Sequence, residues 1–120
     1  MDLLGRFVDI FVNSAIANDD GTGPDHALHY EEMRNMMSRI KRLPTGREAL
    51  VELTNHDSKW VRLWTATELL VDEDSSDAKS VLEQLQKDPG IAGFNAETTL
   101  SEYANGRLKS PFLAPSRETQ

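Results

Sequence analysis

The chain has 120 residues, of which 20 are acidic, 13 are basic and none is cysteine, and 38% are hydrophobic. This length suits one small domain, and the composition is that of a folded chain. The formal net charge of −7 opposes binding to nucleic acid or to an anionic membrane, since Lys and Arg side chains drive both. The absence of cysteine excludes disulfides, thiolate catalysis and cysteine-ligated metal centres.

The N-terminal residues predict neither a signal peptide nor a membrane span. Residues 1–6 contain no cationic n-region, and Arg6 and Asp9 interrupt the apolar run that follows. We therefore expect a cytoplasmic protein without a membrane partner.

Apolar residues recur with a helical period in six segments, and no stretch alternates apolar and polar residues as a half-buried strand would. The sequence therefore predicts an all-α fold of about six helices. The first two are expected over about residues 2–18 and 24–43, with Pro24 in the first turn of the second. One sector of the second helix collects two histidines and a mainly apolar stripe: His26, His29, Tyr30, Met33, Met36, Met37 and Ile40.

The third and fourth helices are predicted from their caps. Thr45 and Glu48 match a capping box, in which the hydroxyl accepts from a backbone N–H three residues on and the glutamate reaches back. Asp57 is expected to cap a fourth helix that runs to about Val71. Apolar residues, the pair Trp60 and Trp64 among them, cover almost its whole circumference, which is typical of a buried central helix.

The fifth helix is predicted to be an outer one, because its apolar residues form a narrow stripe: Ala78, Val81, Leu82 and Leu85. Asp88 and Pro89 supply a cap and a first-turn proline for a sixth helix, which residues 105–106 (Asn-Gly) end.

The domain is expected to comprise residues 1–106. Residues 107–120 show no periodicity and are expected to form an extended or partly disordered tail. Three apolar side chains suit a tail that lies over the last helices: Leu108, Phe112 and Leu113.

Helices three and four are related to helices five and six by an offset of about 30 residues. Leu50 and Leu53 recur as Leu82 and Leu85, 32 residues later, while Ala66 and Leu70 recur as Ala96 and Leu100, 30 residues later. A repeated pair of one outer and one inner helix is how an α-solenoid buries faces that a single repeat could not.

The fourth helix carries the residues of a known repeat pattern. Asp57, the pair Val61 and Arg62, and the small residue Ala66 resemble the inner half of a HEAT repeat. The second copy keeps Ala96 and Leu100 but has no arginine, so it departs from that pattern.

The order of features over residues 47–108 resembles a small bacterial family of HEAT-like α–α superhelices with no assigned activity. The residues that carry the likeness are Arg47, Leu50, His56, Asp57, Val61, Arg62, Ala78, Leu82, Glu83, Leu100, Tyr103, Asn105 and Gly106. The resemblance implies a short right-handed α–α superhelix, HEAT- or ARM-like, in the bacterial cytoplasm. It implies no particular reaction.

Two clusters were weighed as metal sites. His26 and His29 lie one turn apart, but neither Glu31 nor Glu32 shares their face, so we expect two partly buried structural histidines. The acidic residues Asp72, Glu73, Asp74 and Asp77 lack the central glycine of a calcium loop, and the dipole of the fifth helix already accounts for them. We expect no metal, no cofactor and no catalytic residue.

Arg62 is the polar residue that stands out, because it emerges from an almost wholly apolar helix, where an unpaired charge would be costly. We expect a carboxylate or backbone carbonyls as its partner, in a structural link between repeats. Ligand binding by Arg62 remains the alternative.

The leading hypothesis is a non-enzymatic protein-interaction module, immunity- or antitoxin-like, whose helices two, four and six present a shallow concave face to a basic protein. The expected contact residues are Arg62, Asp72, Glu73, Asp74 and Asp77, and the expected state is a monomer or weak homodimer. The alternative is a small-molecule or metal-dependent enzyme that uses His26, His29 and carboxylates.

Overall fold

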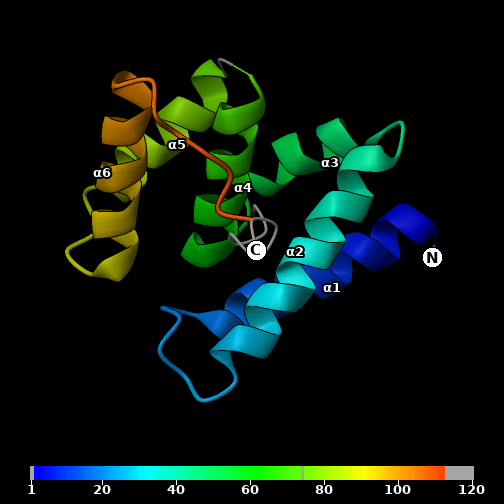
Figure 1. Cartoon of the computed structure of the whole chain (residues 1–120). Helices are drawn as coiled ribbons and strands as arrows, with labels where there is room; N and C mark the ends of the chain where they lie inside the picture. Colours follow the sequence, from blue (N-terminus) through cyan, green and yellow to red (C-terminus); the bar gives the residue numbers. More distant parts are fainter. Residues whose placement is uncertain (1, 74, 113–120) are drawn as a thin grey trace, which may run out of the picture.

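The computed structural model describes residues 2–73 and 75–112, and these residues form six helices and no strand (Figure 1). The all-α prediction is therefore confirmed. The helices are α1 (Leu3–Asn18), α2 (His26–Arg42), α3 (Gly46–Leu53), α4 (Lys59–Asp72), α5 (Ser76–Leu85) and α6 (Ile91–Ala104).

Side-chain caps fix where three of the helices begin. Asp2 accepts a hydrogen bond from the N–H of Gly5 at 2.8 Å and caps α1. Ser58 and Ser75 do the same for α4 and α5, at 3.4 Å and 3.1 Å from the third residue onward. The prediction that Asp57 caps the fourth helix is wrong by one residue, because Ser58 holds the extended backbone that a cap requires.

The predicted capping box at Thr45 does not form. Thr45 has φ −102° and ψ 16°, and its hydroxyl makes no cap hydrogen bond. A tight turn, in which the N–H of Gly46 bonds to Leu43 O at 2.9 Å, precedes α3 instead. It presses Gly46 against the backbone of α2, where a Cβ atom would lie 1.8 Å from Ile40 O, so only glycine fits.

Two other predicted starts also differ. The second helix begins at His26 rather than at Pro24, with Asp25 before it. Asp88 does not cap α6; its carboxylate accepts from the N–H of Gly90 at 2.8 Å and closes the turn that precedes α6.

Helix α4 is central, as its apolar circumference predicts. It packs against α1, α3, α5 and α6, and Val61 and Ala66 are fully buried within it (Figure 1). The stripe of α5 faces α4 and α6, with Ala78, Leu82 and Leu85 buried. Outer and inner helices of these last two pairs are therefore as expected.

The first hairpin, α1 with α2, packs onto α4 chiefly through α1. We expected the second helix in that place. Ser14 and Ala15 of α1 are buried at this contact, and their small side chains allow the two helix backbones to approach closely. The methionine stripe of α2 is buried as predicted, through Met33, Met36 and Met37.

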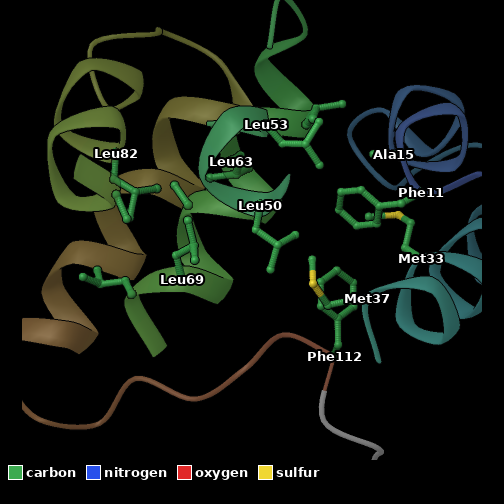
Figure 2. Close-up of a cluster of buried hydrophobic side chains, with 14 of the residues drawn as sticks. Phe11, Ala15, Met33, Met37, Leu50, Leu53, Leu63, Leu69, Leu82 and Phe112 are labelled. Carbon is green, nitrogen blue, oxygen red and sulfur yellow. The ribbon is translucent and has the colours of Figure 1, made fainter. Parts of the chain in front are cut away.

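The C-terminal segment contributes to the core. From the end of α6 the chain crosses α4, and Phe112 enters the space between α4 and the first hairpin, where Figure 2 shows it beside Met37 and Phe11. The ring of Phe112 lies 6.3 Å from that of Phe11 and 5.2 Å from that of Trp64, centre to centre. The tail therefore reaches beyond the last helices. Leu113, also expected to pack there, lies outside the described residues.

The chain is a compact globule of 36 × 33 × 28 Å with a radius of gyration of 13.7 Å. A folded domain of this length is expected near 14 Å. Within residues 2–73 and 75–112, no helix has the length and apolar character needed to cross a bilayer.

Candidate functional site

Arg62 has the partner that its position demands. Its Nη1 donates to the backbone carbonyls of His56 at 2.7 Å and Asp57 at 2.9 Å. Both carbonyls belong to the turn between α3 and α4, so the side chain ties this turn to its own helix pair. It also borders a hollow shared with Val81 and Leu85 of the next pair.

The acidic residues predicted beside it lie at the opposite end of α4. Ten residues, or about 15 Å of helix, separate Arg62 from Asp72. Asp72 pairs with Lys41 at 2.9 Å, and Glu73 pairs with Arg47 at 2.5 Å. Both carboxylates therefore tie the end of α4 to α2 and α3. Asp77 is exposed in the first turn of α5, and Asp74 lies outside the described residues.

The two histidines differ in environment. His29 is partly buried, but His26 is exposed, so the expectation of two partly buried rings is wrong for His26. The reason is that α2 begins at His26, whose Nδ1 lies 2.9 Å from Gly23 O in the preceding loop. Over the part of the chain that the structure describes, no three His, Asp or Glu side chains gather as a metal site.

Two adjoining hollows form what we call the α4 groove. They share Leu63 and Trp64 of α4 and Asn95 of α6. The first, about 250 Å³, is also lined by Thr67, Thr98, Thr99 and Pro111. The second, about 230 Å³, is also lined by Asn18, Asp19, Asp20, Gly21, His26, Tyr30 and Trp60.

Aromatic rings form the floor of the groove. Trp60 and Trp64 were expected in the core; both pack against it but remain partly exposed. Trp64 stacks on Phe112, and Nζ of Lys59 lies 5.4 Å from the centre of the Trp60 ring. The indole N–H of Trp64 is buried with no acceptor among the described residues.

Asn95 stands between the two hollows. Its side chain is half-buried, and its amide makes no hydrogen bond to the described residues. An amide carries both a donor and an acceptor, so this group is available to a bound backbone. Sequence analysis missed it, because a single asparagine in a polar helix face carries no signal of its own.

The end of the groove at the α1–α2 loop is acidic. Asp19 has φ 54° and ψ −127°, a conformation that residues other than glycine rarely adopt and that costs about 1–3 kcal/mol. The hydroxyl and the N–H of Thr22, at 2.6 Å and 3.0 Å, hold the pKa of Asp20 below its ordinary value. Asp20 is therefore ionised at neutral pH.

The largest hollow, about 610 Å³, lies on the other side of the tail, between α2, α4 and residues 108–112. Its buried group is Glu68, which is 2% exposed and pairs with Lys41 through Oε2. Burial opposes the charge of Lys41, but its hydrogen bonds to Glu68 and Asp72 outweigh this and raise the pKa of the amine. These charges satisfy one another, so the hollow is bordered by a structural network.

Sequence analysis also missed Glu68, although the signal was present. Glu68 is a charge in the nearly apolar fourth helix, as Arg62 is, and the argument that demanded a partner for one demands it for the other.

The chemistry of the α4 groove resides in aromatic rings, one amide, threonine hydroxyls and two carboxylates. Rings and carboxylates together favour a cationic group, through cation–π attraction and charge pairing. The chain matches no family model, no curated protein and no solved structure in the comparisons made.

Proposed function

We propose that this protein is a non-enzymatic interaction module that binds a basic protein partner in the α4 groove. The observation that carries the proposal is the floor of tryptophan rings that runs into the carboxylates of Asp19 and Asp20. The net charge of −7 supports it, because an acidic protein attracts a basic one over a Debye length or more. An immunity- or antitoxin-like role, in which the module neutralises a basic bacterial protein, is its concrete form.

The architecture we propose is a short right-handed superhelix with two HEAT-like repeats, α3–α4 and α5–α6. The packing of α4 against both α3 and α6 supports α4 and α6 as the inner helices. The α1–α2 hairpin then caps the first repeat and supplies the acidic end of the groove. We propose a cytoplasmic monomer or weak homodimer.

The steering charge comes chiefly from the groove. Asp72 and Glu73 are ion-paired within the chain, so they attract a partner less than free carboxylates would. Asp77 is exposed and adds to the acidic surface, as would a charged Asp74. Arg62 serves the turn before α4.

A second candidate is a small-molecule or metal-dependent enzyme. The observation that favours it is that His26 borders the same hollow as Asp19 and Asp20. His29 would be the second imidazole in that case. Metal addition, treated in the Discussion, separates this candidate from the first.

Affinity capture from a lysate of the source cells, with matched charge variants, tests the proposal. Asp19→Asn with Asp20→Asn removes the acidic end of the groove. Asp9→Asn with Glu83→Gln removes two exposed carboxylates elsewhere and gives the same net charge. We expect one basic protein to be retained by the parent and by the second variant but lost from the first. Equal retention by both variants, or an acidic protein, would contradict the proposal.

A further inference from the structure

We propose that the α4 groove takes an extended peptide segment with one basic side chain and, two residues away along the peptide, one apolar side chain. This inference rests on the proposed function, since it names the form in which the basic partner enters the groove.

The size and sequence of the hollows support an extended segment. At about 250 and 230 Å³, each lies below the roughly 300–1,000 Å³ of a site for a drug-sized molecule. Trp60 borders one hollow and Thr67 the other, so the groove follows about 10 Å of α4. An extended chain rises about 3.4 Å per residue, so three residues span this length.

The spacing of the side chains follows from the same geometry. Side chains of an extended segment point alternately to opposite faces, and residues i and i+2 share a face. Two hollows in a row along one floor therefore receive residues i and i+2, while the residue between them faces away.

The hollows differ in chemistry, and this difference assigns the two side chains. Carboxylates of Asp19 and Asp20 and the ring of Trp60 surround the second hollow, which suits a guanidinium or an ammonium group. The first hollow has no charged residue in its lining and is bordered by threonines, Leu63 and Pro111. It suits an aliphatic side chain, whose burial there is favourable.

Asn95 favours an extended segment over a helix. Its amide lies between the hollows, where the main chain of the bound residues would pass, and has no partner among the described residues. The main-chain N–H and C=O of an extended segment are free to bond an amide from the side. In a helix these groups are paired internally and unavailable.

Fluorescence anisotropy with labelled synthetic peptides tests the spacing. The probes are glycine heptapeptides that carry one Arg and one Leu, adjacent, two apart or three apart, in both orders. We expect the better order of the two-apart peptide to bind at least tenfold more tightly than the adjacent and three-apart peptides. Equal affinity at all spacings, or no saturable binding of any probe at about 1 mM, overturns the proposal.

Two single substitutions locate the peptide. Asn95→Ala should weaken the two-apart peptide about tenfold and abolish its advantage over the other spacings. Asn13→Ala, an exposed asparagine of α1, is the matched control and should change nothing. Thermal melts within about 2 °C of the parent show that both variants are folded.

The two proposals fail separately. If the captured basic protein is lost with Asp19→Asn and Asp20→Asn but binds Asn95→Ala as tightly as the parent, the extended segment is wrong and the proposed function stands. If no basic protein depends on Asp19 and Asp20, the proposed function itself is wrong.

Discussion

The hydroxyl of Ser110 donates a hydrogen bond to Oε1 of Glu68 at 2.7 Å, across 42 residues of sequence. The other oxygen of this carboxylate pairs with Lys41, which also reaches Asp72. One buried carboxylate thus joins α2, α4 and the C-terminal segment. It stabilises the fold only while both of its partners are present.

Removal of the cation should be more harmful than removal of the carboxylate charge. Lys41→Met leaves Glu68 buried without its counter-charge and should lower the free energy of unfolding by about 3 kcal/mol. Glu68→Gln keeps an acceptor for Ser110 and should cost about 1 kcal/mol. The double variant should resemble Glu68→Gln alone. Urea denaturation measures all three.

The control for this prediction is the ion pair of Arg47 with Glu73, where the arginine side chain is 61% exposed. Arg47→Met should change stability by less than about 1 kcal/mol. If Lys41→Met costs no more than this control, the Glu68 network does not stabilise the fold.

Phe112 should matter as much as a residue in the middle of a helix. Phe112→Ala removes a buried ring and should cost about 3 kcal/mol, or about 10 °C in melting temperature. Phe94→Ala is the matched control, because Phe94 is 63% exposed and its loss should change stability by about 0.5 kcal/mol or less. Equal melting temperatures for the two variants would show that the C-terminal segment is not part of the core.

Stability should fall in alkaline solution. Burial raises the pKa of Tyr30 above its ordinary value of 10.0, and the carboxylates raise that of Lys41 above 10.5 despite burial. In both cases the unfolded chain loses its proton first. Their contribution is therefore complete below about pH 10 and is lost as pH rises through the raised pKa values.

The difference in unfolding free energy between the parent and Lys41→Met isolates the lysine. It should be constant from about pH 8 to 9 and should shrink by about pH 11.5. The same comparison with Tyr30→Phe isolates the tyrosine. A difference that grows with pH has the wrong sign and would contradict the assignment.

The helices, the central place of α4 and the methionine stripe of α2 were predictable, because each depends on the periodicity of its own segment. The start of α3 was not, because the close approach of Gly46 to Ile40 fixes the turn and leaves the Thr45 hydroxyl without its cap bond. Local sequence rules describe a helix end by itself and carry no information on what packs against it.

The candidate site was harder to predict for the same reason. The α4 groove brings together residues from α1, α2, α4, α6 and the C-terminal segment, and no two of these helices are linked by a motif. Asp72 and Glu73 stood out in the sequence as a cluster, but their cations lie more than 25 residues away, at Lys41 and Arg47. A charge run shows neither its partners nor its burial.

Arg62 should tolerate methionine better than alanine. Methionine keeps the apolar volume of the side chain, whereas alanine also leaves a cavity. Because the carbonyls of His56 and Asp57 lie near the surface, their loss of a donor should cost about 1 kcal/mol. Thermal melts compare the two. Parental stability in both, with loss of the basic partner, would instead assign Arg62 to binding.

Metal ions should leave the melting temperature unchanged. A ligand that binds the folded state alone stabilises it by mass action, so zinc, calcium or a chelator would shift the transition if His26 or the acidic loops held an ion. Differential scanning fluorimetry over a concentration series measures this. A rise with zinc that His26→Ala abolishes would favour the enzyme candidate over the interaction module.

The contact between Phe11 and Phe112 also governs when the protein can finish folding during its synthesis. At about 5–20 residues per second, a ribosome needs roughly 5–20 s to make the chain between these two rings. Throughout that time the face of Phe11 and Met37 that receives Phe112 has no cover from it. A nascent chain stalled in this interval would present that surface to chaperones, and the time of release would set how long it stays open.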